Sequence, residues 1–380
     1  MKIRYENSLP LAAEFFSSLG HAEGFDTGTL KPEDLIGVDV LAVRSTTQVH
    51  AELLSCANRL LLVGTATAGI NHLDTAYLDR AGIRWMSAAG CNAQAVAEYV
   101  LSVLFNAHKQ QITNLNNATV GIVGAGFVGT ALAELLEVLG IACVLYDPPL
   151  QERGDPRDFV SWQRIEECDV ITLHVPFTRN GDYATEAMIN EQVLSKLNCK
   201  QLLINACRGE VIDEPALKQR LMADDAPVVV LDVFANEPGI DMELLPLLWL
   251  ATPHIAGHSI EGKLLGTQRV YQAVCELLGI TADKTLSDFL PERPNLHLDL
   301  ELCRDQSDNL APALSLALSV YDVTNDNNNF RQGMTGAETF SAMRKAYGIR
   351  REIAGHQVDG LTQAQPLVAA QLAQLGFNLK

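Results

Sequence analysis

The segment VGIVGAGFVG (120–129) constrains the fold of this chain most strongly, because its glycines lie between two recognisable elements. Gly124, Gly126 and Gly129 form a G-x-G-x-x-G pattern directly after an apolar strand-like run and at the start of a helical one. The first glycine permits a tight turn, the second lets a ligand approach the backbone, and the third allows close helix–strand packing. Free N–H groups at the helix start attract phosphate. The pattern predicts a dinucleotide-binding loop, which includes Phe127 and Val128.

An acidic residue near the expected spacing favours one dinucleotide over another. The next apolar run ends at Asp147, 18 residues after Gly129. A carboxylate at this position hydrogen-bonds the ribose 2′-hydroxyl of NAD and repels the additional phosphate of NADP. Pro148 and Pro149 follow, so no arginine stands there to accept such a phosphate. We therefore predict NAD as the cofactor.

Short apolar runs alternate with helical stretches along most of the chain. Nearly continuous apolar runs in the later part indicate strands of a parallel sheet that helices cover on both faces. We predict an α/β fold with two doubly wound parallel-sheet domains, Rossmann-like or flavodoxin-like. The predicted strands are 39–45, 60–69, 119–124, 141–147, 169–176, 201–209 and 227–234, and the predicted helices are 92–109 and 129–140.

The composition changes near FLPERPN (289–295), where two prolines interrupt the α/β alternation. Leucines then alternate along 295–302, which predicts a half-buried strand of a different sheet. Helical stretches at 311–320 and 338–352 flank an Asn-rich segment, 325–330, which we interpret as a loop. We predict a small α+β domain over 291–380.

The charge balance and the distribution of apolar residues exclude several partners. Lys and Arg number 28 against 46 Asp and Glu, and the resulting net charge of −18 repels a nucleic-acid backbone. No uninterrupted apolar run approaches the roughly 18 residues of a membrane-spanning helix. The start, MKIRYENSLP, is unlike a signal peptide, so we expect a cytoplasmic protein. The eight cysteines contain no C-x-x-C pair, and no metal site is predicted.

Three residues with complementary chemistry follow the last predicted strands: Arg208, Glu237 and His254. In an open parallel sheet, ligands bind outside the carboxyl ends of the strands, so one cleft can gather all three. An arginine binds a carboxylate through two hydrogen bonds. A histidine, with an ordinary pKa of about 6.5, exchanges a proton near neutrality, and a carboxylate orients it. This set predicts oxidation of a 2-hydroxy acid, although each residue alone has an ordinary structural explanation.

Several motifs together resemble the D-isomer-specific 2-hydroxyacid dehydrogenase family, in particular its branch that acts on 4-phospho-D-erythronate. The likeness covers about residues 1–290, and the extra C-terminal domain also fits that branch. The motifs are VRSTT (43–47), GTATAGINHLD (64–74), GCNAQAVAEYV (90–100), VGIVGAGFVG, YDPP (146–149), INACRGEVID (204–213), LDVFANEP (231–238) and TPHIAGHSIEGK (252–263).

The resemblance implies a domain organisation. A substrate-binding domain is expected at 1–92 with 258–290 returning to it, an NAD-binding domain at 93–257, and a C-terminal dimerisation domain at 291–380. The helix at about 93–109 resembles the one that forms dimers in this family. We therefore expect a homodimer. We also expect its substrate to be a small phosphorylated 2-hydroxy acid.

The resemblance also implies roles for individual residues. Arg208 and Glu237 are expected to be catalytic and His254 to be the proton donor or acceptor. The implied NAD contacts are Asp147, Val175, Ala206, Cys207, Arg208, Asp232 and Gly257, and the implied substrate contacts are Ser45, Thr67 and His258. Two positions depart from the branch: His258 replaces a tyrosine, and Val175 replaces a threonine. We expect His258 to retain activity with altered affinity or pH dependence.

Two alternatives remain open on the sequence. A related dehydrogenase, such as one for 3-phosphoglycerate, would use the C-terminal region to bind a regulatory amino acid. An NAD sensor similar to the C-terminal-binding corepressors would bind NAD without turnover. The complete Arg208, Glu237 and His254 set favours catalysis.

Overall fold

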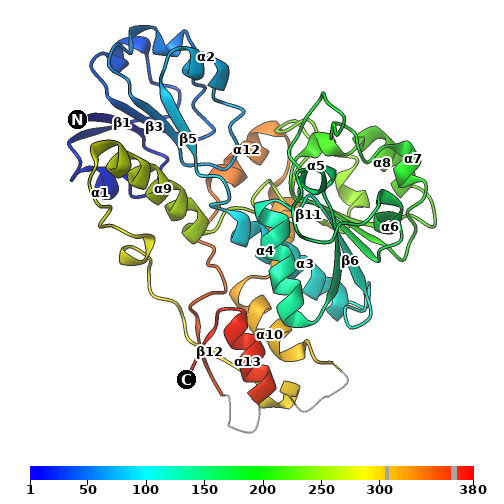
Figure 1. Cartoon of the computed structure of the whole chain (residues 1–380). Helices are drawn as coiled ribbons and strands as arrows, with labels where there is room; N and C mark the ends of the chain where they lie inside the picture. The colour runs from blue at the N-terminus through cyan, green and yellow to red at the C-terminus, as the bar shows by residue number, and fades with distance from the viewer. Residues whose placement is uncertain (304–307, 361–365) are drawn as a thin grey trace. The chain divides into compact units, whose positions relative to one another are not determined.

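The computed structural model describes residues 1–303, 308–360 and 366–380. The chain forms two compact units (Figure 1). Unit 1 consists of residues 1–93 and 258–292, and unit 2 consists of residues 94–257 and 293–380. The chain thus leaves unit 2 after Gly257 and returns to it at Arg293.

Unit 1 is built on a five-stranded parallel sheet in the order β2-β1-β3-β4-β5. Helix α9 packs along this sheet, as the yellow-green ribbon of Figure 1 shows. A Cβ at Gly266 of α9 would lie 2.3 Å from the Ala66 carbonyl oxygen, so the glycine is required for this close contact. The elements are β1 (Lys2–Glu6), α1 (Ala12–Phe16), β2 (His21–Phe25), β3 (Val40–Val43), β4 (Leu62–Thr65), α2 (Thr75–Arg80), β5 (Arg84–Ser87) and α9 (Ile260–Leu278).

Unit 2 contains a six-stranded parallel sheet in the order β11-β10-β9-β8-β6-β7. All pairings are parallel, and successive strands are joined through helices or turns, which confirms the predicted doubly wound fold class. Its strands are β6 (Thr119–Val123), β7 (Ala142–Tyr146), β8 (Val170–Leu173), β9 (Leu202–Asn205), β10 (Val228–Leu231) and β11 (Leu250–Ala251), and its helices are α3 (Ala93–Lys109), α4 (Phe127–Leu139), α5 (Pro148–Glu152), α6 (Trp162–Glu166), α7 (Glu191–Leu194) and α8 (Glu214–Leu221).

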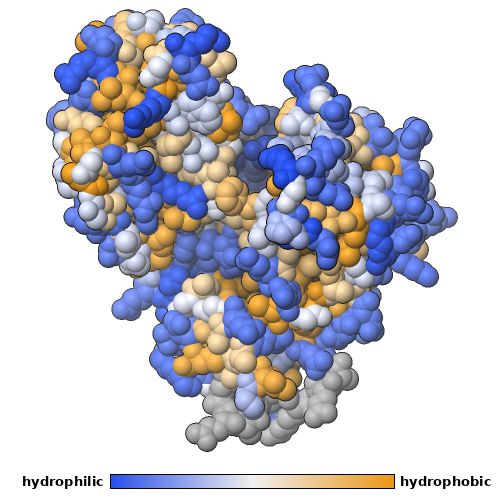
Figure 2. All heavy atoms as spheres, in the orientation of Figure 1, coloured by the Kyte–Doolittle hydropathy of each residue, from blue (hydrophilic) through white to orange (hydrophobic). Residues whose placement is uncertain are grey.

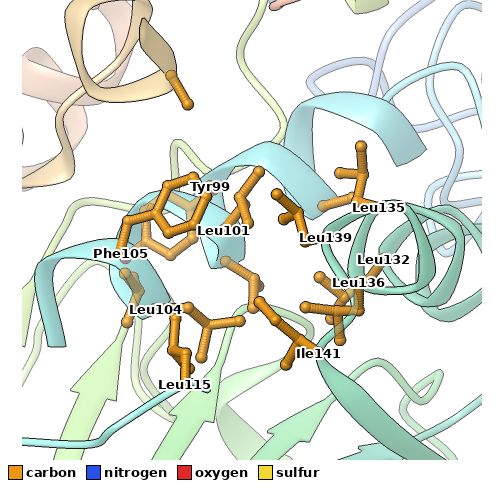
Figure 3. Close-up of a cluster of buried hydrophobic side chains, with 14 of the residues drawn as sticks. Tyr99, Leu101, Leu104, Phe105, Leu115, Leu132, Leu135, Leu136, Leu139 and Ile141 are labelled. Carbon is orange, nitrogen blue, oxygen red and sulfur yellow. The ribbon is translucent and has the colours of Figure 1, made fainter. Parts of the chain in front are cut away.

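The main core of unit 2 lies between α3, α4 and the sheet. Figure 3 shows Tyr99, Leu104 and Phe105 of α3 directed toward the same apolar region as Leu132 and Leu136 of α4. These side chains are buried completely in this single chain. Burial of an aliphatic or aromatic side chain contributes about 1.5–3 kcal/mol, so this cluster is a large part of the stability of the unit.

In its described residues, the C-terminal segment of unit 2 adds a small three-stranded parallel sheet, β12-β13-β14, and the α-helices α10 to α13. Figure 1 shows two of its helices, α10 in orange and α13 in red. The elements are β12 (Leu296–His297), α10 (Ala311–Val320), α11 (Val323–Gly333), α12 (Ala337–Lys345), β13 (Gln357–Asp359), α13 (Pro366–Gln374) and β14 (Asn378–Leu379).

One face of α3 is hydrogen-bonded to this C-terminal segment along its length. Glu98 accepts from the Ile353 N–H at 3.0 Å, Ser102 donates to the Tyr321 carbonyl at 3.0 Å, and Asn106 donates to Asp322 at 3.0 Å. The spacing of four residues places these polar side chains in one stripe on the helix. We call Glu98, Ser102 and Asn106 the polar stripe of α3.

Three sequence predictions for the C-terminal segment were wrong in part. The predicted loop 325–330 lies inside α11, whose buried Val323, Asn327 and Phe330 repeat at helical spacing while Asp322 caps its start. The predicted strand 295–302 ends at His297, because the Asp299 side chain accepts the Glu301 N–H at 3.0 Å and starts a turn. The predicted helix 338–352 ends at Lys345.

Candidate active site

The glycine loop of unit 2 has the geometry that a bound dinucleotide requires. Gly124 has φ +93°, and a Cβ there would lie 2.6 Å from the His174 carbonyl oxygen. A Cβ at Gly129 would lie 2.1 Å from the Gly124 carbonyl oxygen, so this glycine permits α4 to pack against the loop. A Cβ at Gly126 would meet no atom within 4 Å. Gly126 therefore faces open space where a pyrophosphate can approach the backbone.

Asp147 lies at the end of β7 and is hydrogen-bonded to the glycine loop. Its Oδ2 accepts the Ala125 N–H at 2.9 Å, and its Oδ1 accepts the Leu150 N–H at 3.0 Å at the start of α5. These bonds hold the carboxylate beside the loop, and each oxygen retains a lone pair for a ribose hydroxyl. Phe127, the first residue of α4, is 64% exposed.

The predicted catalytic residues follow three adjacent parallel strands. Arg208 follows β9, Glu237 follows β10 and His254 follows β11, and these strands neighbour one another in the sheet. Nδ1 of His254 lies 2.7 Å from Oε2 of Glu237, and Oε1 of Glu237 accepts the Phe234 N–H at 2.9 Å. Glu237 thereby holds one ring nitrogen of His254 and leaves Nε2 as the atom for a substrate proton.

Arg208 occupies a tight turn beside the loop that carries Glu237. A Cβ at Gly209 would lie 1.9 Å from the Phe234 carbonyl carbon, so only glycine permits this approach. The guanidinium of Arg208 donates to its neighbour's carbonyl, Cys207 O, at 2.7 Å and is partly exposed. Burial raises the pKa of the Cys207 thiol to about 11, so this sulfur is protonated at neutral pH and is not a nucleophile.

Asp232, a predicted NAD contact, uses its side chain within the protein. It is 1% exposed, and its carboxylate accepts from Thr252 Oγ1 at 2.6 Å, from the Ile255 N–H at 2.8 Å and from the Ala256 N–H at 2.9 Å. Burial raises its pKa. The carboxylate thus shapes the loop that carries His254. The other predicted NAD contacts, Val175, Ala206 and Gly257, follow β8, β9 and β11, respectively, and each is partly exposed.

The predicted substrate contacts Ser45, Thr67 and His258 all lie in unit 1. Ser45 is exposed after β3, and Thr67 is half-buried after β4. Thr67 Oγ1 lies 2.8 Å from Thr65 Oγ1, which in turn lies 2.9 Å from Nε2 of the buried His72. Burial lowers the pKa of His72, so this ring stays neutral and orients the two hydroxyls.

Glu6 organises the loop that carries Ser45, and the sequence analysis missed it. This completely buried carboxylate accepts hydrogen bonds from Thr47 Oγ1 at 2.7 Å, from the Arg44 N–H at 3.1 Å, and from Thr46. Burial alone would raise its pKa, but the bonds from Ser8, Thr46, Thr47 and Arg44 outweigh burial and lower the pKa to about 2. The sequence signal was an acid ending a strand-like run, KIRYE.

Within 1–303, 308–360 and 366–380, no group of three or more His, Cys, Asp or Glu side chains is arranged to hold a metal ion. In the same ranges, every helix is too short or too polar to cross a bilayer.

Comparisons with known proteins place the chain in a family. The D-isomer specific 2-hydroxyacid dehydrogenase NAD binding domain matches residues 86–256, and a domain of unknown function, DUF3410, matches residues 289–376. Erythronate-4-phosphate dehydrogenase of Pseudoalteromonas atlantica is 48% identical over 382 residues, covering 100% of both chains. The protein of the same name from Marinobacter nauticus is 42% identical and also covers 100% of both.

The chain belongs to the erythronate-4-phosphate dehydrogenase family. This result confirms three predictions: the family, NAD as the cofactor, and the enzyme class, an NAD-dependent 2-hydroxyacid dehydrogenase. The fold agrees with that of an NAD⁺-bound 3-phosphoglycerate dehydrogenase of Entamoeba histolytica, with a TM-score of 0.60 at 23% identity, covering 76% of this chain and 99% of that one.

Proposed function

We propose that this chain oxidises 4-phospho-D-erythronate at C2 to 2-oxo-3-hydroxy-4-phosphobutanoate, with NAD as the hydride acceptor, in pyridoxal 5′-phosphate biosynthesis. The full-length relatives named erythronate-4-phosphate dehydrogenase support the substrate. The observation that carries the chemistry is the 2.7 Å contact between His254 and Glu237 at the ends of adjacent strands. It supplies an oriented base on the unit that holds the glycine loop.

Different residues of the chain transfer the proton, bind the substrate carboxylate and bind the cofactor. Nε2 of His254 accepts the proton of the C2 hydroxyl, and Glu237 stabilises the imidazolium that forms. Arg208 releases its Cys207 carbonyl contact and binds the substrate carboxylate through two hydrogen bonds. NAD, when bound, supplies the carbon centre that accepts the hydride from C2. The glycine loop and Asp147 would hold its pyrophosphate and ribose.

Further contacts are proposed from the family resemblance. Ser45, Thr67 and His258 are proposed substrate contacts. Because His258 replaces a tyrosine, His258→Tyr should change substrate affinity or the pH profile while activity is retained. Val175, Ala206, Cys207, Asp232 and Gly257 are proposed NAD contacts. The carboxylate of Asp232 is used internally, so its contact would be made by its carbonyl oxygen, which accepts the His254 N–H and keeps a second lone pair.

The direct test is NADH formation by the purified chain with 4-phospho-D-erythronate, 3-phosphoglycerate and D-lactate, each with and without a 2-oxo acid to recycle bound cofactor. A preference of at least tenfold in kcat/KM for the first compound is expected. A preference for 3-phosphoglycerate would replace the proposed substrate. NAD binding without turnover of any of the three would favour an NAD sensor instead.

We also propose that the chain is a cytoplasmic homodimer formed through residues 291–380. Helix α3 is buried by its own chain between Val96 and Ala107, so the C-terminal segment, rather than this helix, offers a free surface. Ile349 is 75% exposed and Leu367 is 86% exposed there. Figure 2 shows hydrophobic residues among hydrophilic ones on the visible face of this segment. Light scattering should give twice the chain mass, and Leu367→Glu should lower it; a monomeric wild type would contradict the proposal.

A further inference from the structure

The loop that carries His254 has an unusual backbone that other groups must hold in place. His254 has φ +58°, in the left-handed region that side-chain-bearing residues rarely adopt. Such a conformation persists only where the surrounding structure restrains it. Part of the restraint comes from Asp232: its backbone carbonyl accepts the His254 N–H at 2.7 Å, and its carboxylate accepts the next two N–H groups.

The other side of this loop is held by an arginine of the C-terminal segment. Arg350 is 4% exposed, and one terminal nitrogen donates to the Ala256 carbonyl at 2.8 Å. The backbone of Ala256 is therefore held on both sides of its Cα, by Asp232 at the N–H and by Arg350 at the C=O. The other terminal nitrogen donates to the Ala95 carbonyl in the first turn of α3 at 2.6 Å. One guanidinium thus ties the His254 loop to α3.

Arg350 is itself held by its surroundings. Its guanidinium carbon lies 3.6 Å from the ring centre of Tyr321, a stacking geometry that favours a cation. The Tyr321 hydroxyl donates to Asp326 at 2.9 Å, and the Tyr321 carbonyl accepts from Ser102 of the polar stripe. Three residues beyond Arg350, the Ile353 N–H binds Glu98 of the same stripe. The arginine is therefore placed in advance by the contacts that dock the C-terminal segment on α3.

We propose that Arg350 is a positioning residue, which holds the His254 loop in its active geometry, and that this is a function of the C-terminal segment matched by DUF3410. The proposal rests on the proposed role of His254 as the base. Arg350 acts through the Ala256 carbonyl, and because its side chain is only 4% exposed it is assigned no direct contact with substrate or cofactor. Its loss moves the imidazole relative to C2, and a misplacement of about 1 Å can lower a rate on the order of 100-fold.

A second arginine of the same segment provides a matched control. Arg331 of α11 donates to the Leu245 and Leu248 carbonyls, each at 2.8 Å, before the start of β11. It also clamps the C-terminal segment to the backbone of unit 2, but it contacts the amino end of β11, whereas Arg350 contacts the loop beyond its carboxyl end. Loss of either arginine should weaken docking of the segment, and only loss of Arg350 should affect His254.

The first readout is steady-state kinetics of Arg350→Met, Arg350→Lys and Arg331→Met with 4-phospho-D-erythronate. Arg350→Met should lower kcat about 10- to 100-fold with the Kd for NAD within about twofold. Arg350→Lys, which can serve one carbonyl at a time, should restore part of kcat. Arg331→Met should keep kcat within about twofold. Equal losses of kcat in the two methionine variants, or a wild-type kcat in Arg350→Met, would overturn the proposal.

The second readout is hydrogen exchange of the Ile255 and Ala256 amides in the full chain, which needs no turnover. These amides should exchange at least tenfold faster in Arg350→Met, or in Arg350→Lys if the methionine variant does not fold, and at the wild-type rate in Arg331→Met. Unchanged exchange in a folded Arg350 variant would overturn the proposal whatever the activity. If these amides exchange faster in the Arg350 variant but the wild-type chain turns over no 2-hydroxy acid, then Arg350 does hold the His254 loop and the proposed function is refuted.

Discussion

His254 and Glu237 have separable effects on turnover and on cofactor binding. Neither side chain belongs to the glycine loop, so His254→Ala should lower kcat about 10²- to 10⁴-fold, the usual range for a lost general base, with the Kd for NAD nearly unchanged. Glu237→Gln should also lower kcat, because a neutral amide no longer stabilises the imidazolium. NADH absorbance gives kcat, and nucleotide fluorescence gives the Kd. Comparable losses of both quantities would refute the assigned role of His254.

The stability of the fold at acid pH tests whether ionised Glu6 holds the loop that carries Ser45. Its folded-state pKa of about 2 lies below the ordinary value of 4.5, so its carboxylate stabilises the fold above about pH 4.5 and loses this contribution as the pH falls toward 2. Glu6→Gln should therefore lower the melting temperature at pH 7 and have progressively less effect from pH 4.5 downward. It should also raise KM, because the loop loses its central acceptor.

The control for Glu6 is Glu23→Gln on the neighbouring strand. Glu23 pairs with Arg4 at 2.6 Å, but its side chain is 55% exposed, so its removal should have little effect on melting. A destabilisation by Glu6→Gln that stays constant between pH 3 and pH 7 would contradict the assigned ionisation.

The sequence indicates residues whose side chains have a recognisable catalytic chemistry. It does not indicate residues that act by hydrogen-bonding to distant backbone groups. Arg208, Glu237 and His254 were predicted because each follows a strand of a parallel sheet, and the structure brings Glu237 and His254 into contact. Arg350 was not predicted, because its two carbonyl partners lie 94 and 255 residues away. Every residue has a backbone carbonyl, so the residue type does not show which carbonyl an arginine binds. The polar stripe was visible as Glu98, Ser102 and Asn106 in an otherwise apolar helix, yet its partner was not.

At the scale of elements, two glycines of the glycine loop can be tested separately. Gly126→Ala should weaken NAD binding at least tenfold with little change in melting temperature, because the added methyl group enters open space that the pyrophosphate needs. Gly129→Ala should lower the melting temperature, because its methyl group would collide with the Gly124 carbonyl. Calorimetric titration and thermal melting separate the two effects. A destabilised Gly126→Ala with normal NAD affinity would contradict this division.

Elements with a strong apolar period were predicted well, and those with mixed signals were not. β6, α4 and β7 lie within a few residues of their predicted ranges, because apolar runs and glycines mark both ends. In α11, the helical spacing of Val323, Asn327 and Phe330 was present, but the low helix propensity of asparagine suggested a loop. Tertiary contacts stabilise the helix despite this low propensity: Asn327 accepts the Ala251 N–H of β11 at 3.0 Å.

At the scale of the whole molecule, docking of the C-terminal segment should depend on pH. Burial, followed by repulsion from Glu352, raises the pKa of Glu98 to about 8. Between about pH 4.5 and pH 8 the folded chain thus holds a proton that the unfolded chain releases, so stability decreases as the pH rises through this window. Glu98→Gln should flatten this decrease, measured as melting temperature from pH 5.5 to pH 8.

The exposed helix residue Glu134 of α4 offers the control for Glu98. Glu134→Gln should leave the slope of melting temperature against pH as in the wild type. If Glu98→Gln retains the full wild-type slope, then Glu98 is ionised in the folded chain and the pH dependence has another origin.

The late position of the C-terminal segment has a consequence for synthesis on the ribosome. Helix α3 is complete at Lys109, whereas the residues that bind its polar stripe begin to emerge roughly 200 residues later. At about 5–20 residues per second, the nascent chain carries the polar stripe of this helix uncovered for on the order of 10 to 40 seconds. A chaperone on the nascent chain therefore has its longest access to α3 at the polar stripe, and slow codons before residue 310 would lengthen this time.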